Sequence, residues 1–222
     1  MTALIQINEK NINSIFDKLS SIGKLELPQN GFLRAAWSDE ETAAMKLICK
    51  HATSFGLKSY YDGIGNLHIT AGLIQNGIVQ TGSHLDTVPQ GGNYDGAVGV
   101  VSGLEAINAI TQSGSSLSRG LELIVWRGEE SGTFDVGYKG SKAAFGSLNP
   151  DFLRNKFNGR TLEAAIKSQG FDPSYIGNQT RVFTQSYIDS LIGHIEVHIE
   201  QGKVLETQNA EIGIVTSIRG PS

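Results

Sequence analysis

One histidine and two aspartates stand close together in a glycine-rich part of the chain. His84 and Asp86 follow the apolar run 78–81, and Asp95 lies in the glycine-rich segment 91–96. Imidazole and carboxylate are the ligands that a divalent metal such as zinc selects, and glycine allows the backbone to approach a bound group closely. These residue types at this spacing predict one part of a metal site.

A pair of adjacent acids offers a second part of the same chemistry. Glu129 and Glu130 come directly after the apolar run 121–126. Two neighbouring carboxylates at a strand end repel each other, and a dication nearby would offset that repulsion. One glutamate then serves as a ligand, while the other, with its pKa raised, is suited to act as a general base.

Two further histidines are candidate ligands. His194 and His198 lie on an expected strand over 191–199, where residues two apart share one face, and Glu196 lies between them. This periodicity nominates both histidines and does not choose between them. His51 and His68 have no supporting pattern, and we expect them to be surface or hydrogen-bonded residues.

Neither a nucleophilic triad nor a phosphate loop fits the residues around His84. Ser83, His84 and Asp86 do not form a triad, because adjacent strand residues point to opposite faces and the chain has no Gly-x-Ser-x-Gly elbow. The segment 91–96 is not a phosphate loop, because no Gly-Lys-Ser/Thr follows it. Asp95 taken alone fits a helix N-cap as well as a carboxylate that bridges two metal ions.

The elements that must position these residues are marked by apolar periodicity and by turn signals. Ser38 and Glu41 form an expected capping box at the start of a helix that stops near Gly56, and Asp62-Gly63 predicts a hairpin turn. Further helices are expected over 9–20, 98–109 and 161–169, and strands over 58–61, 66–69, 78–81, 121–126, 191–199 and 211–218.

Strands that alternate with helices predict an α/β fold with a mixed, largely parallel sheet flanked by helices. In such sheets, ligands bind beyond the carboxyl ends of the strands. His84 and the Glu129-Glu130 pair both stand at such ends, so the fold and the motifs point to one site.

The bulk composition describes an ordinary globular protein. The chain has 222 residues, 39% of them hydrophobic, and a net charge of −4. It shows no basic stripe for nucleic acid and no apolar run near the ~20 residues of a membrane span. The first residues lack a basic segment followed by an apolar stretch, so we expect no secretory signal. The single Cys49 fits a reducing compartment, so we expect a cytoplasmic protein that acts on a small molecule.

Several motifs in one order resemble a known family. The chain is similar to the N-carbamoyl-L-amino acid hydrolase, allantoate amidohydrolase and β-ureidopropionase group of dinuclear zinc amidohydrolases, within the aminoacylase and carboxypeptidase superfamily. The resemblance spans nearly the whole chain. Its four main motifs are His-Leu-Asp-Thr at 84–87, Gly-Gly-Asn-Tyr-Asp-Gly at 91–96, Glu-Glu at 129–130 and His-Ile-Glu-Gln-Gly at 198–202. It extends to the segment Tyr-Lys-Gly-Ser-Lys-Ala-Ala-Phe-Gly at 138–146 and to Val-Leu-Glu at 204–206.

The resemblance implies a zinc exopeptidase-like catalytic domain and a set of metal ligands. His84, Asp95 and His198 would hold one metal, and Asp95 would bridge to a second metal that Glu130 also contacts. This assignment favours His198 over His194. Zinc is the expected ion, while manganese, cobalt and nickel suit the same ligands.

The resemblance also implies roles in the reaction. Glu129 would act as general base, Asp86 would orient the histidine before it, and Gln201 would bind substrate. The implied reaction is hydrolysis of a carbamoyl or ureido C–N bond. Two alternatives stay open: a dinuclear aminoacylase or peptidase acting on N-acyl amino acids or dipeptides, and a non-catalytic metal-binding module.

The resemblance sets an expectation about domain organisation. Residues 1–218 correspond to the N-terminal part of the catalytic domain, and 219–222 correspond to the start of a linker to a lid and dimerisation domain. A further histidine ligand and a carboxylate-binding arginine would lie in that later part, through which relatives form homodimers. We therefore expect the 222-residue chain alone to be inactive.

Overall fold

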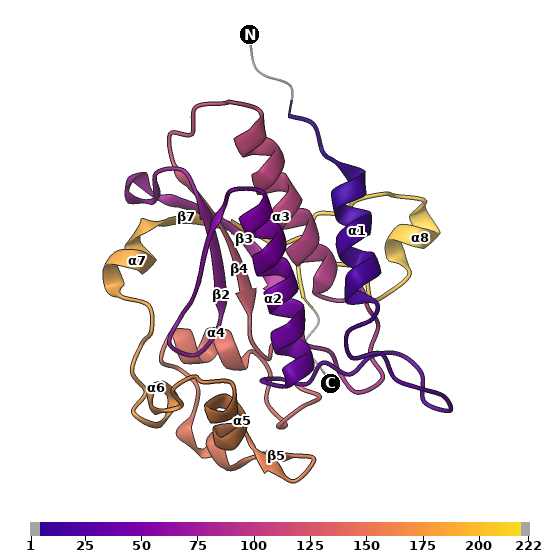
Figure 1. Ribbon diagram of the computed structural model, residues 1–222, viewed down its shortest axis with the longest axis vertical. Helices are drawn as coiled ribbons and strands as arrows, with labels where there is room; N and C mark the ends of the chain where they lie inside the picture. Colours follow the sequence, from indigo (N-terminus) through magenta and orange to yellow (C-terminus); the bar gives the residue numbers. More distant parts are fainter. Residues whose placement is uncertain (1–4, 219–222) are drawn as a thin grey trace.

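The computed structural model describes residues 5–218, and across them five strands form one mixed sheet in the order β1-β2-β4-β3-β7 (Figure 1). The strands are β1 (Lys58–Tyr61), β2 (Leu67–Ala71), β3 (Ile78–His84), β4 (Gly120–Trp126) and β7 (Leu191–Ile195). β1 pairs with β2, and β2 with β4, in antiparallel fashion, whereas β3 runs parallel to both β4 and β7. The expected mixed sheet flanked by helices is confirmed.

Three long helices cover one face of the sheet. Figure 1 shows α1 (Glu9–Leu19), α2 (Asp39–Ser54) and α3 (Ala97–Gln112) close to one another in front of the strands. Their apolar stripes and the inward side chains of β4, Leu123 and Val125, form the main core. In the part of the chain from 5 to 218, no helix has the length and the apolar character needed to cross a bilayer.

The opposite face of the sheet has a smaller apolar cover. The alternate residues of β4, Ile124 and Trp126, pack there with Phe183 and with the short helix α7 (Gln185–Ser190). A separate apolar cluster around Trp37 joins α4 (Lys139–Ala144), α5 (Leu162–Ser168), α6 (Ser174–Gly177), β5 (Lys156–Phe157) and the 3₁₀ helix Pro150–Arg154. The short strand β6 (Arg160–Thr161) pairs with β5. A 3₁₀ turn, Ile74–Asn76, precedes β3, and α8 (Val204–Gln208) lies near the C-terminal end.

The start of α2 follows only half of the expected capping box. The Ser38 hydroxyl accepts the amide N–H of Glu41 at 3.1 Å. The Glu41 carboxylate accepts from the amides of Trp37, at 2.6 Å, and Gly128, at 2.8 Å, and pairs with Arg127 at 2.8 Å. Both members of this ion pair are fully buried, so it ties α2 to the chain that follows β4.

The connection between β1 and β2 is longer than the two-residue turn that Asp62-Gly63 suggests. The Asp62 carboxylate accepts the amide N–H groups of Ile64, Gly65 and Asn66 at 2.8–3.0 Å. An aspartate that bonds to the backbone after it closes a loop by itself, and this loop delays the return strand until Leu67.

Two strand predictions near the C-terminal end are wrong, one in its boundary and one in the existence of the strand. β7 ends at Ile195 rather than at 199. No strand forms over 211–218 within the described residues, where Ile212 and Ile214 are 85% and 92% exposed. Alternating apolar residues favour a strand only where a neighbouring strand and a cover for the apolar face are present. The expected linker at 219–222 lies outside the described residues.

Candidate metal centre

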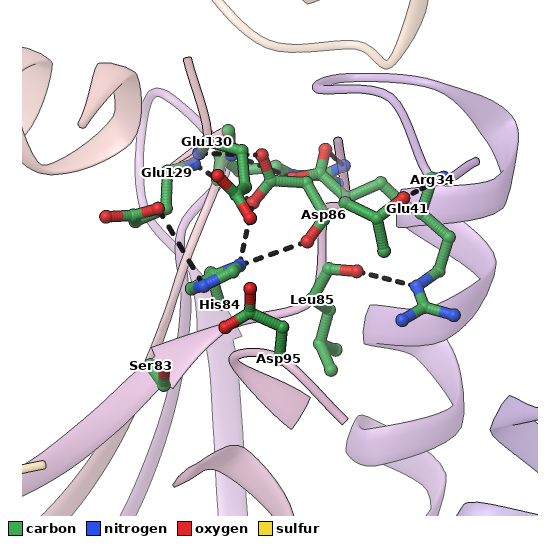
Figure 2. Close-up of polar contacts among 12 residues, drawn as sticks. Arg34, Glu41, Ser83, His84, Leu85, Asp86, Asp95, Glu129 and Glu130 are labelled. Atoms are coloured by element: carbon green, nitrogen blue, oxygen red, sulfur yellow. Dashed lines mark hydrogen bonds and ion pairs between the residues drawn. The ribbon is translucent and has the colours of Figure 1, made fainter. Parts of the chain in front are cut away.

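His84 is the last residue of β3, and its ring is held by the backbone that follows. Its Nδ1 lies 3.0 Å from the main-chain oxygen of Asp86. Because a carbonyl oxygen only accepts, Nδ1 carries the hydrogen and the Nε2 lone pair of the neutral ring is free. Nε2 lies 3.8 Å from a carboxylate oxygen of Glu129, and Figure 2 shows the His84 ring between Glu129 and Asp86, with Asp95 beside it.

Gly96 lets the start of α3 approach that ring. A Cβ at this position would lie 2.6 Å from atoms of the His84 ring, and the residue has a φ of +65°, which side chains other than glycine rarely adopt. Asp95 directly precedes this glycine. The glycine-rich segment therefore carries Asp95 to within reach of His84.

Asp86 is fully buried and joins the loops after two neighbouring strands. Its carboxylate accepts the amide N–H of Glu129 at 2.9 Å and that of Glu130 at 3.1 Å, while Nδ1 of His84 lies 3.4 Å from it. Burial alone would raise the pKa of Asp86, but the hydrogen bond and charge of His84, together with the charge of Lys139, lower it overall. Asp86 is thus the anion that fixes where the paired glutamates lie.

Potential ligand atoms gather in two overlapping groups. His84, Asp95 and His198 can bring one ligand atom each to within 4.8 Å of the others, and so can His84, Glu129 and Glu130. The Nε2 atom of His198 lies 3.2 Å from Asp95 Oδ1. The second group does not include Asp95, so the sharing of Asp95 between two metals stays a prediction.

Gln201 also lies at this centre. Its side-chain amide donates to Asp95 Oδ2 at 2.7 Å. The glutamine therefore lies beside the carboxylate expected to bind metal, where it could also reach a bound molecule.

The crowding of acids shifts the pKa values of the site. Burial, followed by the charges of Asp86, Asp95 and Glu129, raises the pKa of Glu130 to about 7, although the nearby His84 opposes this shift. Burial also raises the pKa of Glu129. For His84, burial lowers the pKa, but the hydrogen bond to Asp86 and the surrounding carboxylates outweigh it and raise the pKa to about 10.

These residues fit a divalent cation. Asp95 Oδ1 is buried and makes no hydrogen bond within residues 5–218. It contacts the ring of His198 at 3.2 Å but lacks the hydrogen bond that buried polar atoms normally make. The imidazoles of His84 and His198 lie in the same group as this oxygen, and such a mixture of nitrogen and oxygen donors suits zinc and its neighbours.

The other three histidines lie outside these groups. His194 bonds to the side chain of Gln80 at 2.8 Å through Nδ1, as a structural residue would. His68 is buried rather than at the surface, and its ring lies 2.9 Å from Glu122. Burial lowers the pKa of His68, but the hydrogen bonds and charges of Asp62 and Glu122 outweigh it and raise the pKa to about 9. His51 lies 3.2 Å from Lys18 at the end of α2.

Sequence reasoning missed the buried cation beneath the site. Lys139 is fully buried and donates to the main-chain oxygens of Glu130, Thr133 and Val136 at 2.6, 3.1 and 2.8 Å. These three hydrogen bonds fix the loop after β4, and the ammonium group places a positive charge near Asp86. The only signal was its place in the family-like segment 138–146, because a single inward lysine has no periodic pattern.

Comparison with known proteins finds amidohydrolases that are similar to this chain over most of its length. The N-carbamoyl-L-amino acid amidohydrolase of Geobacillus stearothermophilus is 32% identical over 93% of this chain and 50% of its own length. The allantoate amidohydrolase of Bacillus subtilis is 30% identical over 94% of this chain and 50% of its own. The crystal structure of a hydantoinase/carbamoylase family amidase from Burkholderia ambifaria has a TM-score of 0.77 and 30% identity over 92% of this chain and 48% of that one.

The sheet and its helices therefore have the fold of the hydantoinase/carbamoylase family amidases. The model of Peptidase family M28 matches residues 65–211, and the chain belongs to this family. The resemblance to the N-carbamoyl-L-amino acid hydrolase and allantoate amidohydrolase group is confirmed. The chain spans about half the length of the curated relatives that it matches.

Proposed function

We propose that the protein containing this chain is a metal-dependent amidohydrolase that cleaves the C–N bond of a carbamoyl or ureido group. N-carbamoyl-L-amino acids and allantoate-like molecules are the proposed substrates, in keeping with the names of the similar proteins. The observation that carries the proposal is the position of Glu129, whose pKa is raised, next to the ligand group of His84, Asp95 and His198.

In this proposal His84, Asp95 and His198 hold one divalent metal, and Asp95 with Glu130 contributes to a second. Zinc is the proposed ion, with manganese, cobalt or nickel as substitutes. A bound metal would supply charge to polarise the substrate carbonyl and to acidify a water molecule. The free Nε2 of His84 and the unbonded Asp95 Oδ1 support these ligand roles.

Glu129 moves the proton in the proposed reaction. Its carboxylate takes a proton from the attacking water and returns it to the leaving nitrogen, which yields an amino acid, carbon dioxide and ammonia from a carbamoyl substrate. Burial raises the pKa of Glu129 above that of an ordinary glutamate, which brings its basicity closer to neutral pH. Asp86 holds the Glu129 amide in place, and Gln201 contacts the substrate.

The proposal predicts that Glu129→Gln abolishes turnover without loss of the metal. We expect kcat on an N-carbamoyl-L-amino acid to fall by roughly 10²–10⁴-fold, the usual contribution of a general base, with unchanged metal content. Glu163→Gln, which removes an exposed carboxylate of a surface ion pair on α5, is the matched control. Full activity of Glu129→Gln contradicts this mechanism, and faster turnover of N-acetyl than of N-carbamoyl amino acids favours an aminoacylase.

We also propose that residues 1–218 act as part of a larger catalytic unit and that the 222-residue chain alone has little activity. Apolar side chains along β7 and beyond it are exposed, with Ile195 at 64% and Ile214 at 92%. Contiguous exposed apolar surface marks contact with further protein. Strong hydrolysis by the purified 222-residue chain would refute this part of the proposal and leave the roles of the individual residues standing.

A further inference from the structure

The position of His198 is not explained by the sheet. The ladder between β3 and β7 pairs Ile78–Thr81 with Leu191–Ile195 and ends there. His198 follows three residues later in a segment without regular structure, and its side chain is 37% exposed. Its Nδ1 lies 2.8 Å from the main-chain oxygen of its neighbour, Ile199, which does not connect it to the sheet. Something beyond the ladder must therefore direct this segment toward Asp95.

Two side-chain hydrogen bonds hold this segment at the site: Gln201 donates to Asp95, as described above, and Glu196 accepts from Ser83. The hydroxyl of Ser83 donates to Glu196 Oε1 at 2.6 Å. Ser83 is almost fully buried and directly precedes His84 on β3, as Figure 2 shows, and Glu196 stands two residues before His198. The bond thus joins the residue beside one proposed ligand to the segment that carries another.

The first turn of α3 is shaped to fit against this bond. A Cβ at Gly99 would lie 2.5 Å from the main-chain oxygen of Val197 and 2.7 Å from the Cβ of Ser83. The absence of a side chain on Gly99 lets the helix touch Ser83 and the backbone of Val197, the residue after Glu196. Because Asp95 lies just before α3, the same contact relates all three elements that supply the first ligand group.

We propose that Ser83 and Glu196 form a latch that holds His198 within reach of Asp95, and that both are positioning residues for the metal site. The latch rests on the proposed function only in so far as His84, Asp95 and His198 bind metal. Glu196 acts by accepting the hydrogen bond of Ser83, so an acceptor oxygen is required at this position and a negative charge is not.

The test compares Ser83→Ala, Glu196→Ala and Glu196→Gln in the full chain by zinc titration. Ser83→Ala and Glu196→Ala are expected to weaken zinc binding roughly 10- to 100-fold, whereas Glu196→Gln, whose amide oxygen can still accept, regains most of the affinity. The double variant Ser83→Ala/Glu196→Ala should be no weaker than either single variant, because both remove the same contact. Equal losses in Glu196→Gln and Glu196→Ala, with Ser83→Ala unaffected, would show an effect of charge and overturn the latch.

Hydrogen exchange of the metal-free chain separates the latch from the metal site. The amides at the end of β7, residues 193–195, which pair with β3 directly before Glu196, should exchange about five- to tenfold faster in Ser83→Ala and Glu196→Ala, as expected for the loss of one hydrogen bond. Ser102→Ala, which removes a hydroxyl bonded within α3, is the matched control and should leave this exchange unchanged. Faster exchange together with no zinc binding by the wild-type chain would refute the proposed function and retain the latch, while unchanged exchange would refute the latch itself.

Discussion

At the scale of single residues, Asp86 positions not only His84 but also the two glutamates of the site. Its main-chain oxygen holds the ring of His84, and its carboxylate holds the amides of Glu129 and Glu130. One residue thereby sets the tautomer of a proposed ligand and the position of the proposed base. The burial of Asp86 is tolerated because each carboxylate oxygen has a hydrogen-bond donor and because Lys139 lies nearby.

Asp86→Asn should therefore weaken both the fold and the metal site. An amide offers one acceptor oxygen instead of two, so one of the two amide N–H groups loses its partner. We expect a loss of about 1–3 kcal/mol in the free energy of unfolding and roughly 10- to 100-fold weaker zinc binding. Urea denaturation and zinc titration measure these two effects, and an unchanged denaturation midpoint would argue against this role.

The metal-free chain should lose stability as the pH rises. The folded-state pKa of His84 is raised from 6.5 to about 10, so the stability it contributes is complete below pH 6.5 and is lost toward pH 10. The pKa of Glu130 is raised from 4.5 to about 7, so its ionisation destabilises the fold as the pH rises through that window. Denaturation in a chelator across this range should show a falling free energy of unfolding.

Zinc should oppose that trend, because metal binding requires the deprotonated forms of both residues and therefore strengthens as the pH rises. His84→Gln in a chelator should reduce the pH dependence above pH 6.5 and leave the part that comes from His68, whose pKa is raised to about 9. A free energy of unfolding that increases with pH in the metal-free chain would contradict the arrangement of charges described for this site.

At the scale of elements, the site exists because the parallel strands β3 and β4 end at the same edge of the sheet. Their following loops bring His84 and the Glu129-Glu130 pair together, and α3 starts beside them with Asp95. The buried pair of Glu41 and Arg127 holds the loop after β4 from the side of α2. α2 and the loop after β4 are thus held together by an ion pair as well as by apolar packing.

Glu41→Gln should destabilise the fold far more than a surface substitution. Removing one partner of a buried ion pair leaves the other charge uncompensated, which costs about 3–5 kcal/mol. Glu40→Gln, at the exposed neighbouring position of the same helix, should change the free energy of unfolding by less than about 0.5 kcal/mol. Similar urea denaturation curves for the two variants would show that the pair does not hold α2 against the loop.

Local patterns predicted the elements that depend on local chemistry. The apolar spacing of α1 and α3 and the Ser38 cap of α2 mark helices that form where expected. The end of β7 and the absence of a strand over 211–218 depend on what lies beside them, which no local pattern contains. In the site, spacing nominated the histidines and acids and the family resemblance favoured His198 over His194, whereas Lys139 and Ser83 act through distant partners and left no such signal.

At the scale of the whole molecule, the proposed metal ligands come from three separate parts of the chain. His84 ends β3 and Asp95 lies just before α3, Glu130 follows β4, and His198 follows β7. Metal binding would therefore connect the well-covered centre of the sheet to its edge at β7, where apolar side chains such as Ile192 are exposed.

The central claim is that His84, Asp95 and His198 bind one metal ion together. Crystals of the protein grown with zinc, measured on both sides of the zinc absorption edge, test it directly. The account predicts an anomalous peak at about 2.0–2.2 Å from Nε2 of His84, a carboxylate oxygen of Asp95 and an imidazole nitrogen of His198. Zinc bound elsewhere, with no peak within bonding distance of these three residues, would contradict it.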